Sequence, residues 1–147
     1  MEIQMMQKGH SLWDKTISFA ESCSWEAGPC LAARMKLNAF RDWERVVVAI
    51  ENETLVGYCT FSERDGLSKE YDYSPFIGFV FVDERHRGKR ISEKMIQQIL
   101  SYAKSIGFLT VYIMSGEQGL YEKYGFEKID DFYTIYGTTD QLFHIGL

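Results

Sequence analysis

One stretch of the sequence decides the fold and the class of ligand: Val80-Phe81-Val82-Asp83-Glu84-Arg85-His86-Arg87-Gly88-Lys89-Arg90-Ile91-Ser92. An apolar run typical of a strand ends at Val82, a charged turn follows, and an amphipathic helix begins within Arg87–Ser92. Such a turn directs several backbone N–H groups to one point, at the positive end of the helix dipole, and so forms a binding site for phosphate. Arg87, Lys89 and Arg90 add positive charge. The stretch therefore predicts a ligand that carries phosphate groups.

The composition is that of one soluble globular domain over residues 1–147. The chain has 46% hydrophobic and 25% charged residues, with no linker, repeat or low-complexity segment. Its formal net charge is -5, which argues against general binding to nucleic acid or anionic membranes and is compatible with a cationic or amine-bearing partner. We therefore expect neither nucleic acid nor a membrane among its partners.

The chain has three cysteines and three histidines: Cys23, Cys30, Cys59, His10, His86 and His144. They show neither Cys-x-x-Cys spacing nor a metal-ligand pattern, so we expect no metal and reduced, mostly buried thiols in an intracellular protein. No apolar stretch approaches the ~20 residues that cross a bilayer, and residues 1–8 are too short and polar for a signal peptide. The expected compartment is the cytoplasm.

Hydrophobic periodicity predicts helices and strands in mixed order around one sheet. Strands are expected over residues 2–7, 45–50, 55–61, 76–82, 108–114, 126–136 and 142–147. Helices are expected over residues 12–23, from 28 to about 40, over 91–106 and over 120–124. The nearly all-apolar run 76–82 is typical of a central strand buried on both faces. This order predicts a mixed α/β or α+β architecture with one central sheet flanked by helices.

The charged turn resembles the signature of a known family. Arg87-Gly88-Lys89-Arg90-Ile91-Ser92 is similar to the Arg/Gln-x-x-Gly-x-Gly/Ala motif of the GNAT superfamily of N-acetyltransferases. In that family the loop cradles the pyrophosphate of acetyl-CoA, so the resemblance implies acetyl-CoA as co-substrate and these residues as its binding loop. Arg90 stands where glycine is usual, and Ser92 stands where glycine or alanine is usual. Both still have a backbone N–H to donate, and Arg90 adds a charge-assisted contact to phosphate.

A second signature of the same superfamily follows later in the chain. Gly119-Leu120-Tyr121-Glu122-Lys123-Tyr124-Gly125-Phe126 looks like its Tyr-x-x-x-Gly-Phe motif after the fifth strand. The family often carries a tyrosine at the position of Tyr121, near the sulfur of the acyl-CoA. A phenol with a pKa of about 10 keeps its proton at neutral pH and can donate it to a departing thiolate. The resemblance implies Tyr121 as general acid; the alternative is that it only packs a short helix against the sheet.

The central strand carries a third implication of the resemblance. In the family the fourth strand splays from the fifth, in a sheet of about six or seven strands, and its free backbone groups pair with the pantetheine arm of the cofactor. The residues implied here are Val80, Phe81 and Val82. We therefore expect Phe76–Val82 and Phe108–Met114 to be neighbouring parallel strands, joined through the helix 91–106, that diverge near Val82.

The general base is not evident in the central strand, because Phe76–Val82 has no carboxylate. Many members of the superfamily use a Glu or Asp on or near the fourth strand to deprotonate the amine, directly or through water. Asp72, just before the strand, is our choice, and Glu63 and Asp65 after the third strand are alternatives. A water relay to backbone carbonyls is a further alternative, and each of these carboxylates has the competing interpretation of a solvated loop charge.

Acceptor specificity in the superfamily comes mainly from the first two helices and nearby loops. That region is aromatic here, and we expect Trp25 and Glu26 to form an apolar, partly acidic amine pocket. The alternative is that its aromatic residues only pack the helices on the sheet. His86 is expected beside the phosphate site, and His144 is expected to pack within a strand.

The resemblance implies an N-acetyltransferase that moves an acetyl group from acetyl-CoA to a primary amine by direct attack in a ternary complex. The acceptor is expected to be a small molecule or a peptide, and a homodimer stays open. The alternative function is a non-catalytic acyl-CoA-binding or regulatory domain that keeps the cofactor loop. A nucleotide-binding domain is disfavoured, because the chain has neither a Gly-Lys-Ser/Thr loop nor the Rossmann glycine set.

Overall fold

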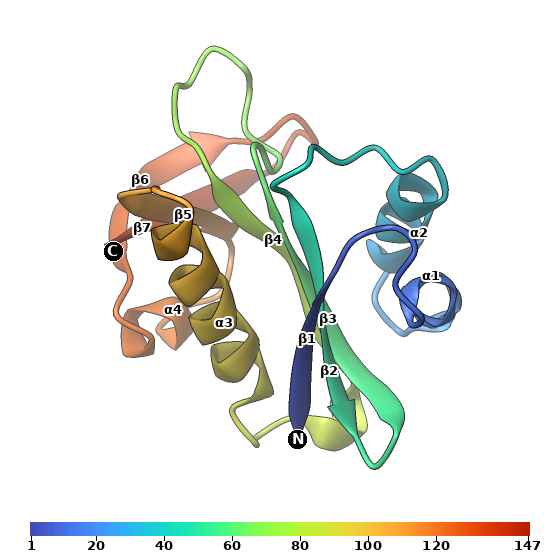
Figure 1. The fold of residues 1–147 in the computed structure, drawn as a ribbon. Helices are drawn as coiled ribbons and strands as arrows, with labels where there is room; N and C mark the ends of the chain where they lie inside the picture. The colour runs from blue at the N-terminus through green and yellow to red at the C-terminus, as the bar shows by residue number, and fades with distance from the viewer.

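A mixed sheet of seven strands, in the order β1-β2-β3-β4-β5-β7-β6, forms the centre of the computed structural model, which describes residues 1–147 (Figure 1). The strands are β1 (Glu2–Met6), β2 (Arg45–Glu51), β3 (Thr54–Ser62), β4 (Phe76–Val82), β5 (Thr110–Ser115), β6 (Glu127–Tyr133) and β7 (Thr139–Gly146). The helices are α1 (Trp13–Ser22), α2 (Gly28–Lys36), α3 (Ile91–Ser105) and α4 (Leu120–Lys123), with a 3-10 turn, η1, at Glu84–His86. The predicted mixed sheet flanked by helices is confirmed.

Helices cover both faces of the sheet (Figure 1). α1 and α2 pack on one face, in a core that includes Leu31 and Val48. α3 packs on the other face, in a larger core that includes Ile96 and Val47. Neighbouring residues of β2 thus enter opposite cores, because side chains alternate along a strand. Burial on both faces explains the long apolar runs of the central strands.

β4 and β5 are parallel neighbours that pair only at one end. Their register joins Phe76 to Tyr112 and Ile77 to Ile113, and no further pair follows. The parallel pairing through the α3 connection confirms the prediction. The strands separate directly after Ile77, which is earlier than the predicted divergence near Val82. The two strands therefore leave a longer open edge on β4 than the sequence predicted.

The end of α2 differs from the predicted one. The helix stops at Lys36 rather than near Phe40. Asn38 has a left-handed backbone (φ 48°) and donates its N–H to the carbonyl oxygen of Met35 (3.0 Å). Asparagine is one of the few residues that tolerate this conformation, which is a common way for a helix to end. The helix therefore ends about one turn before Phe40, where the apolar residues at helical spacing end.

The last hairpin also has a different turn. β6 stops at Tyr133 rather than at residue 136, and β7 begins at Thr139 rather than at residue 142. Thr134 opens the turn, because its N–H donates to the carbonyl oxygen of Thr138 (2.7 Å) and the two hydroxyls share a hydrogen bond (2.8 Å). A bridge between Leu67 and Thr134 holds this turn against the loop between β3 and β4.

The cysteines are all free, and their burial differs from the expectation. Cys59 is buried, Cys23 is half-buried, and Cys30 is exposed at the start of α2. The expectation of mostly buried thiols is therefore wrong for Cys30. No helix has both the length and the apolar character needed to cross a membrane. No group of three or more His, Cys, Asp or Glu side chains is arranged to hold a metal ion.

Candidate active site

A cleft of about 1180 Å³ opens where β4 separates from β5. One end is formed by the charged turn before α3 and by α4. The other end is formed by the α1–α2 loop, the start of the β3–β4 loop and the β6–β7 turn. After the ligands expected from the sequence, we call these the cofactor end and the acceptor end. The predicted site residues that line the cleft are Trp25, Glu26, Val80, Phe81, Val82, Arg87, Gly88, Arg90, Ile91, Ser92 and Tyr121.

The charged turn presents free backbone donors at the cofactor end. The N–H groups of Gly88, Lys89 and Arg90 have no hydrogen-bond partner in the protein, and the first turn of α3 lacks intrahelical acceptors. Two left-handed residues, Gly88 (φ 84°) and Arg90 (φ 61°), shape the turn. The left-handed conformation of Arg90 explains why glycine is usual at this position of the family motif. Such a set of N–H groups at a helix start fits a pyrophosphate.

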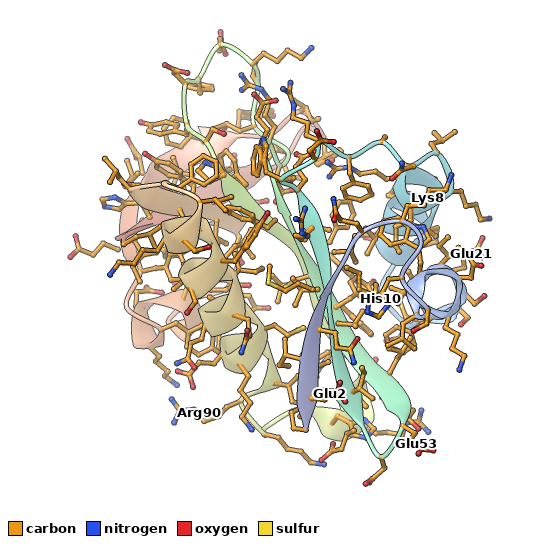
Figure 2. All side chains as sticks on the ribbon, viewed as in Figure 1. Glu2, Lys8, His10, Glu21, Glu53 and Arg90 are labelled. Atoms are coloured by element: carbon orange, nitrogen blue, oxygen red, sulfur yellow. The ribbon has the colours of Figure 1, made fainter.

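The cationic side chains of the turn are held by the protein itself. Arg87 Nε donates to the carbonyl oxygen of Val82 (3.0 Å). Arg90 makes two bonds to Glu93 (2.7 and 3.0 Å) at the start of α3, where Figure 2 labels it. Lys89 Nζ lies 3.3 Å from a carboxylate oxygen of Glu51 and does not line the cleft. The backbone of the turn is therefore better placed for phosphate than the Lys89 side chain.

A bulge in β4 keeps its edge open next to the turn. Tyr58 of β3 pairs with Phe81 and Thr60 pairs with Gly78, so β4 has one residue more than β3 between these pairs. Phe79, inside the bulge, has a left-handed backbone (φ 50°). A bulky residue in this conformation is strained by about 1–3 kcal/mol, and such strain clusters at functional sites. The bulge therefore separates β4 from β5 and frees backbone groups for a ligand.

Tyr121 lies in the wall of the cleft at the start of α4. Its side chain is 4% exposed and packs against the rings of Tyr124, Phe126 and Phe143. Burial raises the pKa of Tyr121 further above that of a free phenol. The hydroxyl therefore stays protonated at neutral pH. Leu120 and Tyr124 of the same short segment are only half-buried, so Tyr121 is the most buried residue of the three.

β4 has no carboxylate of its own, but Asp65 of the β3–β4 loop places one beside it. A β-carbon placed on Gly78 would lie 2.7 Å from Cγ of Asp65 and 2.9 Å from each of its carboxylate oxygens. The carboxylate therefore fills the space of a side chain at the first position after β4 leaves β5. Burial raises the pKa of Asp65 to about 6; Arg34 opposes this rise and Asp140 adds to it. The group is mostly ionised at neutral pH and close enough to its pKa to accept a proton.

The other two candidate bases lie away from the cleft. Asp72 is exposed on the β3–β4 loop and does not line the cleft, so the structure does not bring our chosen base to the site. Glu63 also lies outside it and forms a salt bridge with Arg41 (2.8 Å). The buried carboxylate of Glu44 accepts the N–H of Glu63 (2.6 Å) and so holds the start of the loop. Asp65, two residues later, lines the cleft. The geometry thus favours Asp65 over both.

The acceptor end has an aromatic wall. Trp25 stacks on Phe81, with ring centres 6.1 Å apart and planes 2° apart, and also contacts Tyr58 (6.4 Å) and Phe79 (6.2 Å). Trp25 lines the cleft as well, so the packing role and the binding role are compatible. Glu26 follows it as an exposed residue of the same wall.

His86 lies in the cleft, whereas His144 lies outside it. His86 lines the cleft beside the charged turn, with Nε2 3.9 Å from Glu51. His144 is half-buried in β7 and stacks on Tyr112, with ring centres 6.4 Å apart. Both positions agree with the expectations for a residue next to the phosphate site and for a packing residue in a strand.

Sequence reasoning missed several residues of the cleft, among them Tyr136 and Asp140. Asp140 Oδ1 lies 3.6 Å from the position of a β-carbon on Gly116, just after β5. Gly78 and Gly116 thus each make room for a carboxylate. A glycine inside a strand often marks such a close approach, so Gly78 was an available signal.

The comparisons identify the family. The family model described as Acetyltransferase (GNAT) family matches residues 11–126. The chain therefore belongs to the GNAT family of acetyltransferases. No sequence match was found among the curated proteins with which the chain was compared.

Solved structures of similar fold are also acetyltransferases. An aminoglycoside 6'-N-acetyltransferase from Enterococcus faecium shares 15% identity at a TM-score of 0.74, over 99% of this chain and 97% of that one. Ribosomal-protein-alanine N-acetyltransferase from Brucella melitensis shares 14% identity at a TM-score of 0.71, over 100% of both chains. An aminoglycoside 6'-N-acetyltransferase complexed with coenzyme A shares 14% identity at a TM-score of 0.73, over 99% of this chain and 97% of that one. The fold is that of these enzymes.

The left-handed conformation of Gly88 leads to a test of the cofactor end. Gly88→Val should weaken acetyl-CoA binding by about tenfold or more, because a β-branched residue at φ 84° costs about 1–2 kcal/mol and turns the free N–H groups away from one another. Isothermal titration with acetyl-CoA measures the effect. The rise in Tm at saturating acetyl-CoA should shrink with it.

Gly107 provides a matched control for this change. It ends α3 with φ 101°, has open space around it, and does not line the cleft. Gly107→Val therefore introduces similar backbone strain away from the turn and should leave acetyl-CoA affinity unchanged. Equal affinity of Gly88→Val and the parent would show that the charged turn is not the phosphate site.

Proposed function

We propose that the protein transfers an acetyl group from acetyl-CoA to a primary amine, by direct attack within a ternary complex. The charged turn, the open edge of β4 and Tyr121 all line one cleft. They are the groups that would contact the pyrophosphate, the pantetheine arm and the thioester of acetyl-CoA. This match, together with a similar fold that is known with coenzyme A bound, supports acetyl-CoA as the acyl donor.

The position of the Asp65 carboxylate is the observation that supports catalysis. A domain that only binds acyl-CoA needs the charged turn but no base, and the absence of a carboxylate in β4 was one of two reasons to consider that alternative, beside the replaced glycines of the motif. The Asp65 carboxylate lies over Gly78, next to the open edge where the thioester would sit. Its pKa of about 6 suits the acceptance of a proton at neutral pH. The position of Asp65 therefore supports catalysis over binding alone.

The proposed reaction assigns a role to each of these groups. Asp65 takes a proton from the ammonium of the acceptor, directly or through one water, and the free amine attacks the thioester carbonyl. A backbone N–H of the open part of β4 stabilises the oxyanion that develops on that carbonyl. After the C–N bond has formed, the C–S bond breaks and Tyr121 gives its proton to the sulfur, while the second proton lost by the nitrogen returns to the Tyr121 phenolate through water. The products are an N-acetylated amine and coenzyme A.

Release of the coenzyme A thiol tests the proposed function. The protein is incubated with acetyl-CoA and a panel of amines and peptides, and the free thiol is followed with a thiol-reactive dye. We expect release that depends on both an amine and the protein, with a product heavier by one acetyl group in mass spectrometry. Tight binding of acetyl-CoA without amine-dependent release from any acceptor would instead support a non-catalytic acyl-CoA-binding domain.

A further inference from the structure

The charges that line the cleft are separated along its length. Arg87, Arg90 and Lys123 lie at the cofactor end, where an anionic phosphate is expected. Three carboxylates, from three different parts of the chain, line the acceptor end: Glu26, Asp65 and Asp140. A fourth, Glu117, lines the cleft just before α4 and acts on Tyr121. The cleft is therefore complementary to a negative ligand at one end and to a positive ligand at the other.

Two of these carboxylates lie beside the two separated strands, one at each strand. Asp65 lies over Gly78 on β4, and Asp140 lies beside Gly116 at the end of β5. The negative charge of Asp140 contributes to the raised pKa of Asp65, so the two groups are close enough to repel each other. A single ammonium at Asp65 would leave Asp140 without a counter-charge.

The carboxylates of the acceptor end form no salt bridge or side-chain hydrogen bond, although the charge of Arg34 acts on Asp65 from a greater distance. None of the salt bridges or side-chain hydrogen bonds includes Glu26, Asp65 or Asp140, although all three line the cleft. At the cofactor end, by contrast, Glu51 and Glu93 are paired with Lys89 and Arg90. The charges of the acceptor end are thus available to a ligand.

Aromatic rings enclose the same end of the cleft. Trp25 projects from the α1–α2 loop, and Tyr136 lies on the β6–β7 turn, with its ring 3.2 Å from a β-carbon placed on Gly66. Ile135 donates its N–H to the carbonyl oxygen of Gly66 (2.9 Å), so the turn is held beside Asp65. Figure 1 shows this turn next to the start of the β3–β4 loop. Aromatic faces beside carboxylates favour the binding of ammonium groups.

We propose that the acceptor is a diamine or polyamine, whose reacting amine lies at Asp65 while a second ammonium group binds at Asp140. Glu26, on the opposite wall, is placed for a further positive charge of a longer polyamine. This inference rests on the proposed function, since it assigns the substrate class of the same site. Asp140 is then a specificity residue, and it takes no part in the transfer of protons.

Matched pairs of amines test this substrate class. Straight-chain monoamines and the diamines of the same length, together with spermidine and a short neutral peptide with a free N-terminus, are compared by kcat/KM in the thiol-release assay. We expect each reactive diamine to exceed its monoamine by about tenfold or more, which corresponds to ~1.4 kcal/mol from the second charge. Asp140→Asn should reduce this diamine-to-monoamine ratio towards one.

Glu127→Gln is the control, because Glu127 is an exposed carboxylate of β6 outside the cleft, and it should leave the ratio unchanged. Equal kcat/KM for monoamines and diamines, a preference for the neutral peptide, or an unchanged ratio in Asp140→Asn would overturn the substrate class alone. Absence of thiol release with every amine would overturn the proposed function itself.

Discussion

Replacing Asp65 with asparagine is expected to lower kcat/KM for acetyl transfer by about 10²–10³-fold while acetyl-CoA binding stays unchanged. The carboxylate lies over Gly78 of β4, and asparagine keeps its shape without its ability to accept a proton. In the parent protein kcat/KM should fall as the pH is lowered through about 6, because protonation of Asp65 removes the base. This fall of kcat/KM at low pH should be absent in Asp65→Asn.

Asp72→Asn is the matched control, because Asp72 is an exposed aspartate of the same loop that does not line the cleft. It should keep parental activity. A large loss of turnover in Asp72→Asn together with full activity in Asp65→Asn would restore Asp72 as the base. Full activity in both variants would favour a water relay to backbone carbonyls.

Stability measurements separate a catalytic loss from a folding defect. Folding raises the pKa of Asp65, so ionisation of this group disfavours the folded state, and the cost appears as the pH rises through about 6. Asp65→Asn removes that cost. Its Tm should therefore exceed the parental Tm at about pH 8, and this advantage should vanish at about pH 4. An inactive variant that is more stable at alkaline pH is not explained by misfolding.

Tyr121→Phe should lower kcat by the order of 10²-fold, with acetyl-CoA affinity nearly unchanged. The substitution keeps the ring that packs against Phe126 and Phe143 and removes only the hydroxyl. Because burial raises the pKa of Tyr121, its proton remains available throughout the neutral range. Stopped-flow measurement of thiol release in a single turnover reports the step directly. A parental rate would leave Tyr121 as a packing residue.

Tyr124→Phe is the control for this prediction. Tyr124 also lines the cleft, but its hydroxyl is already hydrogen-bonded to the hydroxyl of Ser92 (2.8 Å) at the start of α3. Loss of the Tyr124 hydroxyl should affect the packing of α4 on α3 and leave the rate of thiol release close to the parental value. Equal rate losses in the two variants would indicate that both tyrosines act by holding α4 in place.

Patterns within short stretches of sequence predicted the parts of this protein that local forces determine. The strand, turn and helix of 76–106 follow from an apolar run, a left-handed glycine at Gly88 and a helical period of buried residues, all within one continuous segment. The cofactor end of the cleft is built almost entirely from that segment and from α4. Its residues were therefore predictable, except for the pairing of Lys89 with Glu51 of another strand.

The acceptor end was decided by tertiary structure, because its residues come from segments that are distant in sequence. Asp65 reaches β4 because buried Glu44 holds the start of the loop and Gly78 leaves space for a carboxylate. Asp140 arrives beside Gly116 because β7 pairs antiparallel with β5. No local pattern distinguishes these carboxylates from the solvated Asp72, since all are polar residues in loops or at strand ends. Their proximity depends on strand pairing and backbone contacts between distant segments, which the fold alone brings together.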